Sequence, residues 1–114
     1  MRQRTAFIPD RGDIVKMSFD PRSGHEQAGW RPALVISPVA YNRASSLALF
    51  CPITSSTKGY PFEVRLPPGL AVSGVVLADQ VRSLDWRARN ASLATKAPEA
   101  VVQDVLARLE PLVT

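Results

Sequence analysis

The stretch LALFCPI (Leu47–Ile53) decides the fold of this chain, because it is an almost unbroken apolar run near the middle of 114 residues. A second run, ALVIS (Ala33–Ser37), lies shortly before it. Such runs suit strands that are covered on both faces, although periodicity alone does not distinguish them from buried helix segments. We therefore expect the two runs to form the central strands of a β-sheet.

Further strands are expected on either side of this centre. Asp13–Phe19 alternates after a turn, and Phe62–Leu66 places its apolar residues on one face and its charged residues on the other. Val75–Val81 is a further apolar segment, opened by Gly74. Together with the central runs, these segments predict five or six short strands separated by proline, glycine and serine.

The C-terminus has the pattern of a helix. Pro98 suits the first helical position, Glu99 favours the positive end of the helix dipole, and Pro111 limits the far end. A single apolar stripe at helical spacing is expected to pack on the sheet: Val102, Val105, Leu106, Leu109 and Leu112. The whole pattern predicts a mainly β (α+β) fold, a single domain over residues 1–114. Its small, strongly bent antiparallel sheet would form an SH3-like barrel with a terminal helix.

The composition is that of a globular domain with a modest basic excess. Fourteen Lys and Arg against 10 Asp and Glu give a net charge of +4. All the cations except Lys16, Lys58 and Lys96 are arginines. A guanidinium binds phosphate with a rigid fork and stacks on bases, so this bias indicates a nucleic-acid partner. A GC-rich genome would produce the same bias.

The cysteine and histidine content restricts the kinds of site. Cys51 is the only cysteine and His25 the only histidine. These two residues cannot provide an intramolecular disulfide or a Cys/His zinc site, and Cys51 is expected to be a small buried hydrophobe. A carboxylate site for Mg²⁺ stays open on composition. Because no apolar run approaches the ~20 residues of a membrane span and Met1–Thr5 lacks a signal-like stretch, we expect a cytoplasmic protein.

Two polar, glycine-bearing segments fit no strand: Asp20–Trp30 and Ser55–Pro61. The first contains two carboxylates, an imidazole, an arginine and an indole, and the second places hydroxyls before Lys58 and Tyr60. Hydroxyls and backbone N–H groups bind phosphate oxygens, and tyrosine offers a surface on which a base can stack. Loops carried by a rigid sheet are where function tends to lie. Both segments therefore indicate a nucleic-acid site.

These loops contain the groups that RNA cleavage without metal requires. A base must accept the 2′-hydroxyl proton, a cation must stabilise the phosphorane, and an acid must protonate the departing 5′-oxygen. Glu26 could be the base and Arg31 the electrostatic stabiliser, while Thr54 or Ser55 could bind a phosphate oxygen. His25 could serve as base or acid. A surface ion pair between Glu26 and Arg31 would explain their spacing equally well.

The chain resembles the MazF/PemK family of toxin endoribonucleases, most closely its MazF branch. The resemblance runs in order from about Phe7 to the C-terminus. It lies in short motifs: PDRGD (Pro9–Asp13), EQAGWRPA (Glu26–Ala33), LVISP (Leu34–Pro38), Tyr41-Asn42, Thr54–Glu63 with its KGYPF core (Lys58–Phe62), ADQV (Ala78–Val81) and WRAR (Trp86–Arg89).

This resemblance implies a function in detail. It implies the barrel shared by MazF, PemK and CcdB toxins, a homodimer, and cleavage of single-stranded mRNA at short sequences without metal or other cofactor. The expected products carry 2′,3′-cyclic phosphate and 5′-hydroxyl ends. Translation and growth would stop, and a MazE-like antitoxin with an acidic C-terminal segment would cover the RNA site. The family motif assigns catalysis to Glu26, Arg31 and Thr54, although Glu26 could equally position RNA or Arg31.

Further residues are predicted to contact RNA: Arg22, His25, Gln27, Trp30, Ser55, Ser56, Lys58, Tyr60, Asp79, Gln80, Arg87 and Arg89. Structural alternatives remain for some of them. Trp30 could cover the mouth of the barrel, and Asp79 and Gln80 could make buried structural hydrogen bonds. Arg87 and Arg89 could belong to a turn that places Trp86 in the core.

Two other functions fit the expected fold. The first is a toxin that inhibits gyrase by protein contact, but gyrase poisons of this fold end in a Trp-Gly-Ile-like tail. This chain ends in Pro111-Leu112-Val113-Thr114. The second is a plain SH3-like binding module, which would not explain why Glu26, Arg31 and the hydroxyl run occur together. The sequence therefore favours the endoribonuclease.

Overall fold

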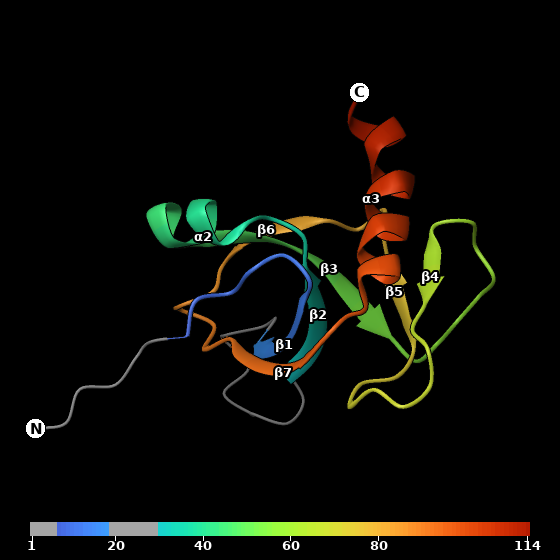
Figure 1. Ribbon diagram of the computed structural model, residues 1–114, viewed down its shortest axis with the longest axis horizontal. Helices are drawn as coiled ribbons and strands as arrows, with labels where there is room; N and C mark the ends of the chain where they lie inside the picture. The colour runs from blue at the N-terminus through green and yellow to red at the C-terminus, as the bar shows by residue number, and fades with distance from the viewer. Residues whose placement is uncertain (1–6, 19–29) are drawn as a thin grey trace, which may run out of the picture.

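The computed structural model describes residues 7–18 and 30–114 of the chain. These residues form seven strands and two helices (Figure 1). The elements are β1 (Asp13–Ser18), β2 (Trp30–Val35), α2 (Val39–Ser45), β3 (Leu47–Thr54), β4 (Glu63–Arg65), β5 (Val75–Leu77), β6 (Arg82–Asp85), β7 (Ser92–Lys96) and α3 (Glu99–Val113). No helix in this part of the chain is both long and apolar enough to cross a membrane.

The strands form one antiparallel sheet in the order β4-β5-β3-β2-β1-β7, and β6 also pairs with β3. The long strand β3 is the centre, as its apolar run predicts. Its first half pairs with β6 and its end pairs with β5, while β2 lies along its other side. The path ends at β4 and β7, so the sheet is open and the predicted barrel is only loosely realised. The mainly β fold with a C-terminal helix is confirmed.

Alternate residues of the central strands supply two cores, one on each face of the sheet. Leu34, Cys51 and Ile53 belong to a cluster that includes buried residues of α3. Their neighbours Val35 and Phe50 belong to a second cluster. Because both faces of β2 and β3 are covered by apolar groups, these strands contain almost continuous hydrophobic sequence.

Two strands were not expected from the sequence pattern, and both are short. β6 has one buried residue in four, so it shows little apolar periodicity. β7 has no fully buried residue, and it begins at Ser92. Ser92 is a strand residue because it pairs with Lys16 of β1. Trp86 lies in the turn before β7, within the second cluster, and its 4% exposure confirms its expected place in the core.

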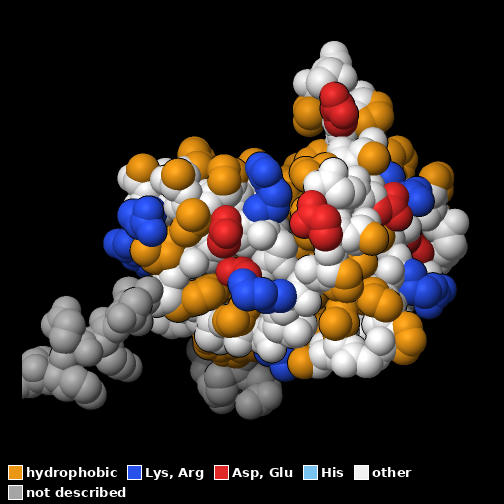
Figure 2. All heavy atoms as spheres, viewed as in Figure 1, with side chains coloured by type: hydrophobic (Ala, Val, Ile, Leu, Met, Phe, Trp, Pro, Cys, Tyr) orange, Lys and Arg blue, Asp and Glu red, His pale blue; other side chains and the backbone are white. Residues whose placement is uncertain are grey.

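The helix α3 begins one residue later than predicted and does not end at Pro111. Pro98 is the N-cap, and Pro111 lies in the last turn, where the ring removes one hydrogen bond and the helix still closes on Thr114. The predicted stripe is buried near the sheet at Val102 and Val105. Leu112 is 49% exposed, because the end of α3 extends past the sheet and stands clear of the molecule (Figures 1 and 2).

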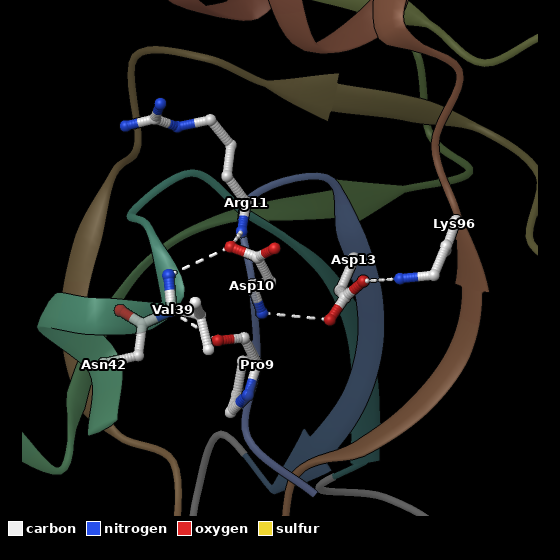
Figure 3. A network of polar contacts seen from close by, with 7 residues as sticks. All are labelled: Pro9, Asp10, Arg11, Asp13, Val39, Asn42 and Lys96. Atoms are coloured by element: carbon white, nitrogen blue, oxygen red, sulfur yellow. Dashed lines mark hydrogen bonds and ion pairs between the residues drawn. The ribbon is translucent and has the colours of Figure 1, made fainter.

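The short helix α2 was also missed, and polar contacts rather than apolar periodicity fix it (Figure 3). Asn42 is fully buried and donates from Nδ2 to the carbonyl oxygens of Pro9 and Ser37, at 2.7 and 3.0 Å. The Asp10 carboxylate accepts the Val39 N–H at 2.9 Å. These contacts tie the segment before β1 to the helix.

The same network of polar contacts extends to β7, which is an edge strand of the sheet. Asp13 is 3% exposed, and its carboxylate accepts hydrogen bonds from the Asp10 N–H at 2.9 Å and from Lys96 Nζ at 2.7 Å (Figure 3). The hydrogen bond from Lys96 to Asp13, followed by the attraction between their charges, raises the pKa of Lys96. Asp13 thus joins β7 to the start of β1.

Candidate active site

The pairing of β2 with β3 brings Arg31 and Thr54 together. Ala33 faces Pro52 and Leu34 faces Cys51 in this antiparallel pair. Arg31 lies two residues before Ala33, and Thr54 lies two residues after Pro52. Because every second residue of a strand extends from the same face, Arg31 and Thr54 lie on the same side of the sheet, and both line the same hollows. Two residues that are far apart in the sequence thus become neighbours.

A cleft of about 400 Å³ lies over the end of β3. The following residues line it: Arg31, Pro52, Ile53, Thr54, Ser56, Lys58, Tyr60, Glu63, Leu77, Gln80 and Arg82. Three of these side chains are cationic and one is a carboxylate, so the cleft has a positive balance. A positive groove with an aromatic ring at its edge is suited to single-stranded nucleic acid, and Tyr60 is 62% exposed.

The sheet supplies the floor of this cleft. Glu63 of β4 faces Leu77 of β5, and Arg82 of β6 faces Phe50 of β3. Since every second residue of a strand extends from the same face, Phe50, Pro52 and Thr54 share the side on which Arg82 lies. Arg31 of β2 and Arg82 of β6 therefore line the cleft from two strands that pair with β3.

A second hollow of about 300 Å³ adjoins the cleft. Arg31, Ile53 and Thr54 line both spaces. The second hollow adds Trp30 and Ser55, together with Pro32 and Ser73. Arg31 and Thr54 therefore lie at the junction of the two hollows, where they can contact a ligand that passes from one into the other.

The loop Ser55–Pro61 is held at its two ends by side chains. At its start, Thr54 Oγ1 accepts the Ser56 N–H at 3.1 Å. At its far end, the Glu63 carboxylate accepts the Thr57 hydroxyl at 2.7 Å and the N–H groups of Lys58 and Gly59 at 2.9 and 3.0 Å. The hydrogen bond from Thr57, followed by that from Lys58, lowers the pKa of the Glu63 carboxyl.

Comparison with known proteins identifies the family to which this fold and sequence belong. Residues 10–113 match the family described as "PemK-like, MazF-like toxin of type II toxin-antitoxin system". The chain belongs to this family. It is a MazF-type toxin, which confirms the resemblance seen in the sequence motifs.

Individual relatives match almost the whole chain. The endoribonuclease toxin MazF of Escherichia coli strain K12 is 48% identical over 108 residues, covering 94% of this chain and 96% of the relative. The endoribonuclease PemK of Escherichia coli is 38% identical over 109 residues, covering 92% and 82%. The predicted enzyme class, an endoribonuclease, agrees with both, and neither is named as a gyrase inhibitor.

Solved structures match equally well. The crystal structure of MazF from Deinococcus radiodurans superposes with a TM-score of 0.86 at 54% identity, covering 95% of this chain and 98% of that one. A MazE-MazF structure from the same organism gives a TM-score of 0.86 at 51% identity, covering 94% and 97%. The open antiparallel sheet with its C-terminal helix is therefore a MazF fold.

The cleft of this MazF-type toxin gathers many of the residues predicted from the sequence. Arg31, Thr54, Ser56, Lys58, Tyr60 and Gln80 line the larger hollow, and Trp30 and Ser55 line the smaller one. Four predicted residues lie outside the described parts of the chain: Arg22, His25, Glu26 and Gln27. Their roles remain predictions.

Three predicted RNA contacts, Asp79, Arg87 and Arg89, are not among the residues that line either hollow. The guanidinium of Arg87 stacks over the Trp86 ring at 4.6 Å from its centroid. Arg89 donates from Nη1 to the Ser18 carbonyl oxygen at 3.0 Å. Both arginines thus make contacts within the fold, on the turn that follows β6.

Sequence reasoning missed two charged residues that line the MazF-type cleft, Glu63 and Arg82. Glu63 follows the hydroxyl-rich loop and lies on the charged face of an alternating segment, a pattern that assigns it no role. Arg82 directly follows the ADQV motif, and pairing of this segment with the apolar strand would have pointed to it. Neither the pairing of β6 with β3 nor that of β4 with β5 can be predicted from local sequence.

Two further features concern the chemistry at and near the cleft. Burial, followed by the charge of Asp79, raises the pKa of Cys51 to about 12, and its thiol is fully buried as expected. Within residues 7–18 and 30–114, no three His, Cys, Asp or Glu side chains lie close enough together to hold a metal ion.

Proposed function

We propose that this MazF-type endoribonuclease toxin cuts single-stranded mRNA at short specific sequences by a metal-independent reaction. The observation that carries the proposal is that Arg31 and Thr54, from two neighbouring strands, line both the cationic cleft and the hollow that adjoins it. A cation and a hydroxyl on neighbouring strands can grip one phosphate from two sides.

In the proposed reaction the RNA supplies its own nucleophile. Glu26, or His25 in its place, accepts the proton of the 2′-hydroxyl, and the 2′-oxygen forms a bond to the adjacent phosphorus. The Arg31 guanidinium stabilises the charge that develops on the phosphorane, and the Thr54 hydroxyl donates to a phosphate oxygen. The bond from phosphorus to the 5′-oxygen then breaks, and that oxygen takes up a proton from the protonated base or from water. The products are a 2′,3′-cyclic phosphate and a 5′-hydroxyl.

The rest of the cleft supplies binding along the strand. Lys58 and Arg82 bring positive charge to the phosphates on either side of the cut. The exposed ring of Tyr60 offers a stacking surface for a base. Ser56 and Gln80 carry donors and acceptors that can read a base edge, which would restrict cleavage to particular sequences.

The proposal includes partners and a cellular effect. Relatives with the same fold form MazE-MazF complexes in Deinococcus radiodurans. We expect this chain to form a homodimer and to bind a MazE-like antitoxin, whose acidic segment would compete with RNA for the positive cleft. Released from it, the toxin would cut mRNA in the cytoplasm and stop translation and growth.

Cleavage of a long single-stranded transcript in excess EDTA tests the reaction. The fragments should end in 2′,3′-cyclic phosphate and begin with 5′-hydroxyl, as resolved by mass spectrometry and by kinase labelling of the 5′ ends. Sequencing these ends gives the recognised motif. No cutting, or cutting that appears only after Mg²⁺ is added, would refute the mechanism.

The substitution Arg31→Ala tests the residue assignment. Because Arg31 is exposed, the fold should be retained, while cleavage should fall by at least about 10²-fold, as for loss of one preorganised transition-state donor. Arg43→Ala removes an exposed cation from α2, away from the cleft, and is the matched control. If the two variants cut at similar rates, the role assigned to Arg31 is wrong.

Antitoxin competition is tested with a synthetic acidic peptide. Its affinity should weaken when the Arg31→Ala variant is saturated with an uncut RNA oligonucleotide, because both ligands need the positive cleft. Unchanged peptide affinity in saturating RNA would show that the two sites are separate.

A further inference from the structure

A carboxylate is an unexpected group in a cleft that binds RNA. Glu63 lines the same hollow as Arg31, Lys58 and Arg82, and it brings a negative charge close to where phosphates would lie. By charge alone, Glu63 should weaken RNA binding. Its contacts show a different use.

Both oxygens of Glu63 are occupied by donors from three consecutive residues of the loop. Oε1 accepts the Thr57 hydroxyl at 2.7 Å and the Gly59 N–H at 3.0 Å, and Oε2 accepts the Lys58 N–H at 2.9 Å. Hydrogen bonds to an ionised acceptor are about twice as strong as neutral ones. The depressed pKa of the Glu63 carboxyl has the same cause.

The loop turns back on itself between Gly59 and Glu63, and further hydrogen bonds hold this turn. The Glu63 N–H donates to the Tyr60 carbonyl oxygen at 3.1 Å, and Gly59 adopts a φ of +77°. From α3, Arg108 donates from Nη1 to the Pro61 carbonyl oxygen, while its Nε bonds Asp104 at 2.9 Å. The loop residues from Ser55 to Pro61 are exposed, so apolar burial contributes little to their position.

We propose that Glu63 is a positioning residue of the RNA site: its carboxylate gathers the donors of Thr57, Lys58 and Gly59 so that Lys58 and Tyr60 are held over the cleft. The inference rests on the proposed function, because it assigns these two side chains to RNA. It also explains why a negative charge is placed in a positive cleft: it repels phosphate weakly and orders the binding loop strongly.

The two possible roles of Glu63, positioning the loop and repelling phosphate, predict changes of KM in opposite directions for the same variant. Glu63→Gln keeps the shape but replaces one acceptor oxygen by an NH₂ group that faces loop donors. If Glu63 positions the loop, KM for a single-stranded transcript should rise about tenfold, the effect of losing one charged hydrogen bond, while kcat changes less than about threefold. If it acts only as a repulsive charge, KM should fall.

Matched variants separate positioning from general charge effects. Glu110→Gln removes an exposed carboxylate from the end of α3 and should leave KM unchanged. Thr57→Val removes one of the three donors and keeps the charge, so it should raise KM by a smaller factor than Glu63→Gln. A fall in KM for Glu63→Gln, or an equal change in Glu110→Gln, would overturn the proposal.

A measurement without RNA separates the ordering of the loop by Glu63 from the proposed cleavage of RNA. Amide hydrogen exchange, followed by NMR, should show protected Lys58 and Gly59 N–H groups in the wild type and faster exchange in Glu63→Gln, with an unchanged melting temperature. Equal exchange in both proteins would refute the ordering of the loop. If exchange responds as expected but the wild type cuts no RNA, the proposed function fails while the loop anchor stands.

Discussion

The substitution Gly74→Ala should disturb the end of β3 from outside the cleft. A Cβ at this position would lie 2.3 Å from the carbonyl oxygen of Thr54, where ordinary contacts begin near 3.4 Å, so one backbone must move by about 1 Å. The position also has a φ of +124°, which L side chains rarely adopt. Strain of this kind costs about 1–3 kcal/mol, and overpacking about 1–3 kcal/mol more.

The displaced backbone belongs to the candidate active site. Thr54 pairs with Val75, the residue after Gly74, and the Gly74 carbonyl oxygen accepts the Leu66 N–H at 3.0 Å. Relief of the clash must therefore move the β4–β5 hairpin or Thr54 itself. We expect the free energy of unfolding, measured by urea denaturation, to fall by at least about 2 kcal/mol. RNA cleavage should also fall at temperatures where the variant is fully folded.

Gly69→Ala is the matched control for this prediction. Gly69 has a φ of +96°, but nothing lies within 4 Å of the point that an added Cβ would occupy, so this variant carries the conformational cost without the clash. The free energy of unfolding of Gly69→Ala should fall by about 1–2 kcal/mol, and its RNA cleavage should be unchanged. If Gly74→Ala unfolds no more readily than Gly69→Ala, the close approach between Gly74 and Thr54 does not constrain the sheet and the reasoning is refuted.

Three substitutions and one reagent test the supporting structure. Asp13→Asn should lower the free energy of unfolding by about 1–3 kcal/mol, because a buried acceptor of Lys96 is lost. Lys96→Met should lower the free energy of unfolding by less, since the Lys96 side chain is 71% exposed. Cys51, with its pKa raised to about 12, should resist iodoacetamide at a mildly alkaline pH in the folded protein and react in urea, as followed by mass spectrometry. Asn42→Ala should lower the free energy of unfolding, measured by urea denaturation, by at least about 3 kcal/mol because three buried hydrogen bonds disappear. A loss below about 1 kcal/mol would show that these hydrogen bonds do not stabilise α2.

The sequence predicts those parts of the fold that apolar patterns create. The run Leu47–Ile53 becomes the central strand, and the stripe of α3 reaches the core through Val102 and Val105. It does not predict α2 or β6, because their positions depend on partners far away in the chain. The α2 helix is fixed by Asn42 and by Asp10, which lies before β1, and no local periodicity reports such contacts.

The candidate site divides in the same way. Arg31, Thr54 and the loop with Lys58 could be named from residue chemistry and family motifs, because each stands in a recognisable short segment. Arg82 could not, because it reaches the cleft through the pairing of β6 with β3. The proposed role of Glu63 also depends on geometry, since the purpose of an acidic residue in a positively charged cleft becomes clear only once its hydrogen-bond donors are known.

The strand β3 explains why a small open sheet can hold such a site. Cys51 and Ile53 extend into the core that α3 covers, whereas Pro52 and Thr54 line the cleft. Ile53 is 5% exposed and also borders the cleft, so movement of the core residues must shift Thr54 as well. The end of the candidate site at Thr54 is therefore joined directly to the core. The loop Ser55–Pro61 is exposed and lacks that support, so hydrogen bonds hold it instead, three of them to the Glu63 carboxylate.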